Sequence, residues 1–430
     1  MMLRSCTCLA MCVSLFVAAT AAASEHWPGW RGPTGMGLSD EKGLPLTWGG
    51  KEQSNVRWKV PLFPSEKVRR DQNQSSPIVW GERVFVTVSY WSEGVSEKEY
   101  PEHHVLCFHR DDGRQLWDVK VKPGPWKLTD LRGGYTAPTP ACDGHRVYAA
   151  FGSAVVAAIT VEGKEAWRKE MIPFDFDVAW GASPIIHGDT VIITCDEMKK
   201  ASFLTALDGK TGDVRWKKAR PDVDWAHSTP LLAKVGGKMQ LIAATANGPQ
   251  GIDPSTGDVI WSFRSDKRLG DTVTPVHHDG LVYVDSGRGG GLGPIGIAVD
   301  ATGQGDISKT PPKWQIPAPT EAFSSPLSVG DLFYRVRSPG VLTCRKWADG
   351  TEVYKPERLD GIDHAVSPVA SADGRIYCAS AGKAYVIKAG PIFEVLGSSD
   401  LGDPGRGAPA VAAGRIYLKG SRFLFCIGTR

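Results

Sequence analysis

The sequence has no excess of either charge. Lys and Arg together number 50 against 47 Asp and Glu, so the formal net charge of the 430 residues is +3. Affinity for nucleic acid rests largely on positive charge that displaces counterions from phosphates. The short basic cluster Lys67, Arg69 and Arg70 lies beside Asp71 and is typical of a solvated loop. We therefore expect no nucleic-acid partner.

The chain also lacks a long apolar run, since no stretch reaches the roughly 18 apolar residues that a transmembrane helix needs. Near the N-terminus, a short apolar run from Leu9 to Ala19 follows Arg4 and precedes the small residues Ala21 to Ala23. This order is typical of a secretory signal peptide. We expect residues 1–23 to be cleaved off and the mature protein to be periplasmic or extracellular, without a membrane span.

Cysteine is scarce and never occurs as an adjacent pair. The cysteines that remain after residue 23 are Cys107, Cys142, Cys195, Cys344, Cys378 and Cys426. All but one fall inside strand-like apolar runs, where a free thiol packs as a small apolar side chain. Their spacing is not that of a disulfide framework, so we expect them in the core. The Cys-x-x-Cys-His motif that attaches haem is absent as well.

What the chain does have is a repeated unit of about 40 to 60 residues. Each copy opens with a proline that usually follows Ser or Thr, continues with strand-like apolar runs, and in the clearest copies ends with Asp-Gly or Thr-Gly followed by Trp. The eight opening prolines are Pro77, Pro140, Pro184, Pro230, Pro275, Pro326, Pro368 and Pro409. Repeats of this length that contain only strands indicate a solenoid or a β-propeller, and the four antiparallel strands expected in each copy are those of a propeller blade.

The ends of the chain predict how the ring closes. The eighth repeat stops at Phe423–Ile427 and lacks its Trp-bearing strand, whereas Asn55–Val60 has the pattern of that strand and no strands before it. The sequence therefore predicts an all-β, eight-bladed β-propeller over residues 55–430. Its blades are four-stranded and antiparallel, and an N-terminal strand completes the last blade.

The recurring Trp residues are interpreted as packing residues. A large ring on an outer strand fills the wedge between neighbouring blades and places its indole N–H near backbone carbonyls. These residues are Trp58, Trp117, Trp167, Trp216, Trp261 and Trp314.

The best copy, Thr205 to Trp216, reads Thr-Ala-Leu-Asp-Gly-Lys-Thr-Gly-Asp-Val-Arg-Trp. This pattern resembles the pyrroloquinoline-quinone-type (PQQ) propeller repeat, and the resemblance covers roughly residues 55–427. The repeat is shared by quinoprotein alcohol dehydrogenases and by BamB-type outer-membrane assembly factors. The resemblance thus implies a fold and leaves the activity open.

For a dehydrogenase, the resemblance would imply a disulfide between adjacent Cys residues, Ca²⁺ held by Glu, Asn and Asp, and an Asp base. No adjacent Cys pair occurs, and no spaced set of carboxylates stands out. We therefore expect no catalytic residues, no metal site and no cofactor, with PQQ and Ca²⁺ as the alternative. The pairs His103–His104 and His277–His278 are expected to be solvated or in turns, because adjacent strand residues point to opposite faces.

The segments just before each Ser/Thr-Pro strand are expected to converge on a mouth of the central channel. They combine aromatic residues with both signs of charge, which suits capture of a peptide or a small ligand. The predicted mouth residues are Gln74, Arg132, Tyr135, Asp177, Trp180, Trp225, His227, Asp271, Phe323, His364 and Arg406.

Residues 24–54 stand outside the repeats and contain Trp27-Pro28-Gly29-Trp30-Arg31-Gly32-Pro33. This segment resembles the opening of exported planctomycete-type proteins with these repeats, and we expect it to run across the propeller surface. We interpret the protein as a monomeric, non-catalytic scaffold of the bacterial envelope that captures an envelope protein or a small ligand. The alternatives are a PQQ-dependent oxidoreductase and a glycan-binding propeller that uses Trp180 and Trp225.

Overall fold

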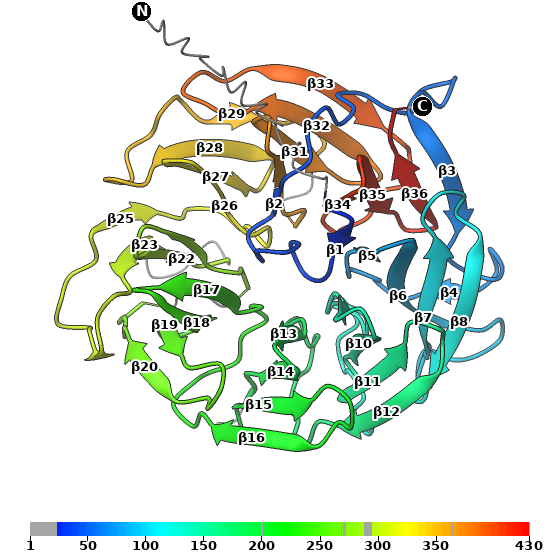
Figure 1. Ribbon diagram of the computed structural model, residues 1–430, viewed down its shortest axis with the longest axis horizontal. Coiled ribbons are helices and arrows are strands. Elements are labelled where there is room, and N and C mark those ends of the chain that lie inside the picture. The colour runs from blue at the N-terminus through cyan, green and yellow to red at the C-terminus, as the bar shows by residue number, and fades with distance from the viewer. Residues whose placement is uncertain are drawn as a thin grey trace, which may run out of the picture.

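A computed structural model describes residues 24–198, 201–267, 269, 272–287, 295–362 and 365–429. In this part of the chain the regular elements are strands, and they form eight small sheets around a central axis (Figure 1). The predicted eight-bladed propeller is thereby confirmed. The proposed signal peptide lies outside the described residues.

Each of the first four blades contains four antiparallel strands, which follow one another from the innermost strand outwards. Blade 1 consists of β5 (Ile78–Trp80), β6 (Arg83–Trp91), β7 (Glu102–His109) and β8 (Gln115–Val121), with β4 (Arg69–Arg70) beside β6. Blade 2 consists of β9 (Ala141–Cys142), β10 (Arg146–Phe151), β11 (Val155–Thr160) and β12 (Glu165–Glu170). Blade 3 consists of β13 (Ile185–His187), β14 (Thr190–Cys195), β15 (Phe203–Asp208) and β16 (Val214–Ala219). Blade 4 consists of β17 (Leu231–Val235), β18 (Lys238–Thr245), β19 (Gly248–Ile252) and β20 (Val259–Ser262), with β24 (Gly305–Asp306) parallel to β20.

The other four blades follow the same order. Blade 5 consists of β21 (Val276–His278), β22 (Leu281–Asp285), β23 (Ile295–Asp300) and β25 (Trp314–Pro317). Blade 6 consists of β26 (Leu327–Val329), β27 (Leu332–Arg337), β28 (Val341–Lys346) and β29 (Glu357–Arg358). Blade 7 consists of β30 (Val369–Ser371), β31 (Arg375–Ala379), β32 (Lys383–Lys388) and β33 (Val395–Asp400). Blade 8 consists of β34 (Ala410–Ala412), β35 (Arg415–Lys419), β36 (Phe423–Ile427) and β3 (Val56–Pro61).

The middle strands of a blade are buried on both faces, because a neighbouring blade covers each face. In β11 every residue from Val155 to Ile159 is buried, and this accounts for its continuous apolar sequence. The outer strand β16 instead alternates between exposed and half-buried residues. Buried apolar residues therefore lie at the interfaces between neighbouring blades as well as inside each blade.

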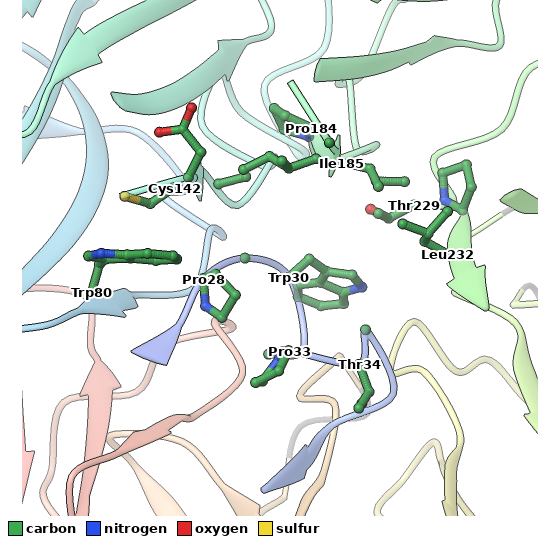
Figure 2. A pocket seen from close by; sticks show the side chains of 18 residues that line it. Pro28, Trp30, Pro33, Thr34, Trp80, Cys142, Pro184, Ile185, Thr229 and Leu232 are labelled. Atoms are coloured by element: carbon green, nitrogen blue, oxygen red, sulfur yellow. The ribbon is translucent and has the colours of Figure 1, made fainter. Parts of the chain in front are cut away.

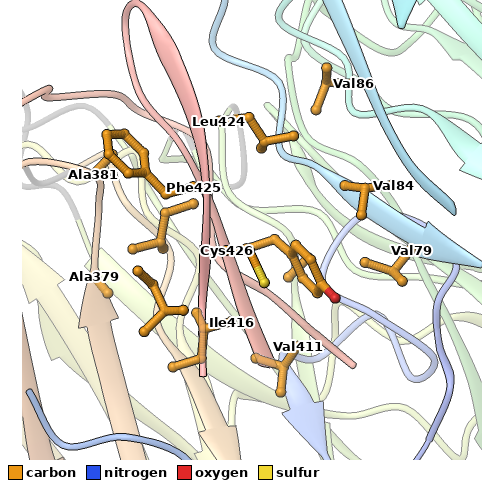
Figure 3. Close-up of a cluster of buried hydrophobic side chains, with 14 of the residues drawn as sticks. Val79, Val84, Val86, Ala379, Ala381, Val411, Ile416, Leu424, Phe425 and Cys426 are labelled. Atoms are coloured by element: carbon orange, nitrogen blue, oxygen red, sulfur yellow. The ribbon is translucent and has the colours of Figure 1, made fainter. Parts of the chain in front are cut away.

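Blade 8 closes the ring with strands from both ends of the chain. β3 pairs antiparallel with β36, and Trp58 lies opposite Cys426, as the sequence predicted. A buried cluster extends from this blade to both neighbours (Figure 3). It includes Val84 of blade 1, Ile416 and Phe425 of blade 8, and Ala379 of blade 7. The two termini are thus held by one continuous apolar core.

The repeat Trp of one blade packs against the turn glycine of the next. A Cβ on Gly163, whose φ is +87°, would stand 2.6 Å from Cγ of Trp117, so only glycine fits there. The same contact links Trp58 to Gly113, Trp167 to Gly212, Trp216 to Gly257, and Trp314 to Gly350. The two ends of the repeat motif therefore meet across each of these blade interfaces.

Several of these indoles also donate a hydrogen bond across the interface. The acceptors are the carbonyl oxygens of Arg110 for Trp58 (2.9 Å), Val161 for Trp117 (3.1 Å), Gly209 for Trp167 (2.9 Å) and Trp347 for Trp314 (2.8 Å). Trp261 differs, because its indole donates to Oε1 of Gln240 within its own blade. There β24 runs parallel to β20, outside the outer strand of blade 4.

All six cysteines after residue 23 are buried as free thiols, which agrees with their expected place in the core. Among the described residues, there is no helix with the length and apolar character that crossing a bilayer demands.

Candidate functional site

The residue before each opening proline belongs to a ring of residues around the central axis. We call positions 76, 139, 183, 229, 274, 325, 367 and 408 the hydroxyl ring, since all but Ala408 carry Ser or Thr. The backbone N–H at one position donates to the hydroxyl of the next blade, as from Ser76 to Oγ1 of Thr139 (2.9 Å) and from Ser325 to Oγ of Ser367 (2.8 Å). This bond explains why the repeat opens with Ser or Thr.

Six such links are found among the described residues of the ring. Besides the two above, they run from Thr139 to Ser183 (3.0 Å), from Ser183 to Thr229 (2.9 Å), from Thr274 to Ser325 (3.1 Å) and from Ala408 to Ser76 (2.8 Å). Ala408 has no hydroxyl to offer to blade 7. The hydroxyl of Thr274 instead accepts a hydrogen bond from the indole of Trp30 (2.8 Å).

Residues 24–54, which we call the extension, cross the centre of the ring with the part from β1 (His26–Trp27) to β2 (Leu38–Ser39) (Figure 1). They then reach the outermost strand of blade 7, where the backbone N–H of Trp48 donates to Oγ of Ser399 (2.8 Å) and Gly49 pairs with Asp400 of β33. β1 pairs antiparallel with β5 and adds an inner strand to blade 1. β2 pairs in parallel with β30 and does the same in blade 7. The inner edges of two blades thus bind the first part of the segment.

Two residues between β1 and β2 reach the level of the hydroxyl ring. The indole of Trp30 bonds to Thr274 of blade 5, and the Arg31 guanidinium lies 3.4 Å from the carbonyl oxygen of Pro368 in blade 7. A further backbone bond, from Cys142 to the carbonyl oxygen of Pro28 (2.7 Å), holds the segment to blade 2. The extension thus forms a plug that contacts several blades at once.

A pocket of about 370 Å³ lies between this plug and blades 2, 3 and 4 (Figure 2). Its wall is dominated by proline, glycine and apolar side chains, with few polar groups. It is lined by Pro28, Gly29, Trp30, Gly32, Pro33, Thr34, Gly35, Trp80, Ala141, Cys142, Asp143, Pro184, Ile185, Ile186, Gly188, Thr229, Pro230 and Leu232. Such a wall offers apolar contact area with a few polar groups for orientation.

The pocket borders two strand edges. β13 and β17 are the innermost strands of blades 3 and 4, and among the described residues no further strand pairs with either of them on that side. An unpaired strand edge presents backbone N–H and C=O groups that can pair with another extended segment. The pocket therefore combines an apolar wall with two backbone edges.

The pocket begins at the opening prolines and extends along the inner strands, away from the predicted mouth. Predicted mouth residues precede the opening proline of each blade, whereas pocket residues such as Ile185 and Leu232 follow it. Sequence reasoning placed ligand capture only at the predicted mouth. The sequence feature that lies beside the pocket is the Trp27–Pro33 segment. The repeats do not predict that this segment lies in the centre of the ring.

Most of the described residues of the predicted mouth reach the surface at least in part. Arg132, Asp177, Phe323 and Arg406 are exposed, while Gln74, Trp225 and His227 are half-buried. The Gln74 amide donates to the carbonyl oxygens of Arg132 (3.1 Å) and Gly133 (2.9 Å), which joins the loops of blades 1 and 2. The rings of Trp225 and His227 lie 5.3 Å apart.

Two other predicted mouth residues are buried. Trp180 belongs to an apolar cluster and donates from its indole to the carbonyl oxygen of Thr194 (2.9 Å). Tyr135 is 1% exposed, and its hydroxyl accepts a hydrogen bond from the Leu128 N–H (3.1 Å). The prediction that Trp180 and Tyr135 lie at an open rim is therefore wrong, because both side chains are buried in packing contacts. Asp271 and His364 lie outside the described residues.

The histidine pairs behave differently from one another. His103 and His104 are buried in β7, so the expectation of solvated residues is wrong for them. The imidazole of His103 lies between the hydroxyls of Ser89 and Ser153, at 2.9 Å from each, and burial lowers its pKa to about 3. His277 and His278 are half-buried strand residues at the end of β21, and the His277 imidazole accepts a hydrogen bond from Gly280 N (3.2 Å) in the turn that follows.

Two buried carboxylates lie just below the rim and are each accompanied by cations. Asp285 accepts hydrogen bonds from Arg335 (2.9 Å to each oxygen) and from Arg337 (2.5 Å). Burial acts to raise the pKa of Asp285, but the two guanidiniums hold it below its usual value. Asp71 accepts from the Tyr135 N–H (2.6 Å), and burial raises its pKa to about 6.

The sequence from residue 101 to 356, more than half of the chain, matches the family of the outer membrane protein assembly factor BamB. The chain therefore belongs to this family of propellers. A comparison with curated proteins gave no match.

Solved structures with the same fold include both assembly factors and enzymes. BamB from Moraxella catarrhalis is 14% identical, with 87% of this chain and 98% of that chain covered and a TM-score of 0.57. A europium-containing methanol dehydrogenase is 12% identical (91% and 89% covered, TM-score 0.63). The quinohemoprotein alcohol dehydrogenase from Comamonas testosteroni is 13% identical (96% and 82% covered, TM-score 0.63). At these identities the likeness shows the fold alone.

A dehydrogenase of the quinoprotein type would need a quinone and a metal ion, and the donor chemistry of the two buried carboxylates does not suit a cation. The oxygens of Asp285 are taken by two guanidiniums, and Lys419 contributes positive charge near Asp71. Within the described ranges, no three His, Cys, Asp or Glu residues gather in a metal-binding group. Hard cations need several free oxygen ligands, so the described residues do not fit Ca²⁺.

Proposed function

We propose that this chain is a non-catalytic binding propeller of the bacterial envelope that captures an extended segment of a protein partner in the pocket beside the plug. The observation that carries the proposal is that the propeller already binds two extended segments in this way. β1 and β2 add strands to the inner edges of blades 1 and 7. The inner edges of blades 3 and 4 border the pocket in the same ring.

The chemistry of the pocket favours a peptide over a charged small molecule. Main-chain hydrogen bonds to an edge strand give affinity to any extended segment, and side-chain pockets beside the edge select among segments. Here the wall includes Trp30, Ile185 and Leu232, and its few polar groups include Thr34 and Asp143. We therefore propose a partner segment with apolar side chains at alternate positions.

The family and the leader-like N-terminus support the same proposal. The family is that of BamB, which is described as an outer membrane protein assembly factor. The predicted signal peptide would deliver this chain to the envelope. We propose that it acts there as a monomer. A protein partner in the envelope is consistent with both.

The proposal is tested by selecting peptides from a displayed random library on the purified chain and measuring their affinity for two variants. Thr34 is exposed on the pocket wall, so Thr34→Arg places bulk and charge in the pocket without disturbing the core. The matched control is Thr310→Arg, at an exposed position of the segment between β24 and β25. We expect selected peptides to lose at least tenfold in affinity for Thr34→Arg only. Equal binding by both variants would show that the peptides do not bind in the pocket.

The predicted mouth is proposed as a second, weaker contact surface for the same partner. Phe323 is 37% exposed there, and Arg132 and Arg406 add positive charge. Replacing Trp225 and His227 together is expected to reduce capture and to change the melting temperature (Tm) little. Unchanged capture by this double variant would restrict the partner to the pocket.

A further inference from the structure

Arg31 of the plug carries a positive charge that the described residues leave without a counterion. Its side chain is only 1% exposed, and its backbone adopts φ +58°, a left-handed conformation that non-glycine residues rarely take. The next glycine along the plug, Gly32, also has a positive φ (+77°) and packs against Trp27. The chain thus accepts local strain to direct this guanidinium into the centre of the ring.

The guanidinium uses few of its hydrogen-bond donors. Nη2 lies 3.4 Å from the carbonyl oxygen of Pro368, whereas Nε and Nη1 are buried and meet no acceptor among the described residues. Gly37 leaves room for the side chain, because a Cβ there would stand 2.9 Å from Nη2. A buried ion without partners is strongly destabilising, so these N–H groups require acceptors that the described protein atoms do not supply.

The surroundings add positive charge. Arg335 lies close enough to lower the pKa of Arg31 to about 9, together with burial, which is the larger cause. Arg335 and Arg337 share the single carboxylate of Asp285. The carboxylate of Asp285 is thus already shared by two guanidiniums, while Arg31 lies near Arg335 in a region shielded from water. This excess of positive charge attracts an anion.

We propose that a small oxyanion, either an inorganic phosphate or sulfate or the carboxylate of a small acid, binds beside Arg31 and accepts hydrogen bonds from its free N–H groups. Oxygen acceptors suit guanidinium donors, and such charge-assisted bonds are shorter and stronger than neutral ones. The anion would balance the positive charges of Arg31 and Arg335 and would stabilise the plug in the ring. This site is separate from the pocket, whose lining does not include Arg31.

The first test measures Tm in sodium phosphate, selenate, acetate and chloride at equal ionic strength. Three proteins are compared: wild type, Arg31→Met, and the control Lys51→Met, which removes an exposed cation of the same extension. We expect a saturable rise of a few degrees with at least one oxyanion in wild type and Lys51→Met, and no such rise in Arg31→Met. General salt effects are common to all three proteins and cancel. The responding anion distinguishes an inorganic ion from a carboxylate.

The same rise in Arg31→Met, or an equal rise of the wild type in chloride, would overturn the proposal. A second test does not depend on a variant that folds. Crystals of the wild-type protein grown in selenate are expected to show an anomalous selenium peak within hydrogen-bond distance of Nε or Nη1 of Arg31. For a carboxylate, growth in bromoacetate replaces selenate and the bromine peak is sought near the same atoms. Density for water alone at both atoms in both crystals would overturn the proposal.

Discussion

The indole Nε1 of Trp30 donates a 2.8 Å hydrogen bond to Oγ1 of Thr274, and so joins the plug to the hydroxyl ring. In three successive links, from position 76 to 229, ring hydroxyls accept from the N–H of the preceding blade. At Thr274 the hydroxyl serves the extension instead. The plug is therefore part of the hydrogen-bonded centre of the propeller.

Trp30→Phe is expected to loosen the plug, because it removes this hydrogen bond and keeps most of the apolar contact. The net loss is about 1 kcal/mol. Hydrogen–deuterium exchange of peptides from residues 24–54 measures the effect, which we expect as faster exchange around β1 and β2. Trp48→Phe is the matched control, since the Trp48 indole N–H is buried without an acceptor among the described residues. Equal acceleration in both variants would show that the hydrogen bond is unimportant.

The hydroxyl that is missing at position 408 of the ring suggests a stabilising substitution. Ala408→Ser would place a hydroxyl where the ring has none and offer an acceptor to blade 7. We expect a gain of about 1 kcal/mol and a higher Tm. Ser325→Ala is the reverse experiment, because it leaves the buried N–H of Thr274 without its 3.1 Å acceptor, at a cost of about 1–3 kcal/mol. A lower Tm for Ala408→Ser would contradict the role given to the ring.

Gly163 tests the contact between the turn glycine and the repeat Trp. Gly163→Ala is expected to lower stability by more than the roughly 1–2 kcal/mol that a positive φ alone costs, because its Cβ would overlap Trp117. Gly374→Ala is the control, since Gly374 has φ +76° and nothing within 4 Å of a built Cβ. Equal decreases of Tm in the two variants would mean that the overlap with Trp117 adds nothing to the cost of the positive φ.

Lys419 predicts a pH dependence of stability. Its ammonium group is buried against Ser75 Oγ (2.6 Å) and Thr87 O (2.8 Å), and burial lowers its pKa to about 7, against about 10.4 in the unfolded chain. Between these values the unfolded state binds more protons, so stability rises with pH. The cost of the buried charge is fully present below pH 7 and disappears towards about pH 10.4.

We therefore expect the Tm of the wild type, relative to Lys419→Met, to rise from pH 7 to pH 10. Below pH 7 the titration of Lys419 adds no further change to this difference, because the cost of the buried charge is fully present there. Asp71 titrates in a lower window, between its ordinary value near 4 and about 6, where its raised pKa makes stability fall with rising pH. Thermal melts of both proteins across this range measure the difference. A difference that stays constant from pH 7 to pH 10 would refute the assignment.

The sequence predicted the ring because its signal is repeated. The Ser/Thr-Pro openings and the Gly and Trp of each copy report contacts between neighbouring blades, and these contacts recur around the fold. The Trp58 strand was assigned to blade 8 for the same reason. Local patterns of this kind remain readable without any knowledge of distant contacts.

The site was less predictable because its parts are not repeated. The hydrogen bond between Trp30 and Thr274 joins residues 244 positions apart, and no local pattern encodes it. The burial of Trp180 was missed as well, because a Trp in a segment between blades gives the same sequence signal whether it faces solvent or the core. The pocket exists only where the plug leaves the edges of β13 and β17 uncovered.

The central claim is that a partner segment pairs with the inner edge of blade 3 inside the pocket. The most direct measurement is hydrogen–deuterium exchange of the wild-type chain with and without a library-selected peptide, read at the amides of Ile185–His187. We expect those of these amides that face away from β14 to exchange at least tenfold more slowly when the peptide is bound, because strand addition protects backbone N–H groups on the free edge. Protection confined to the predicted mouth, around Arg132 and Trp225, with none at Ile185–His187, would contradict the account.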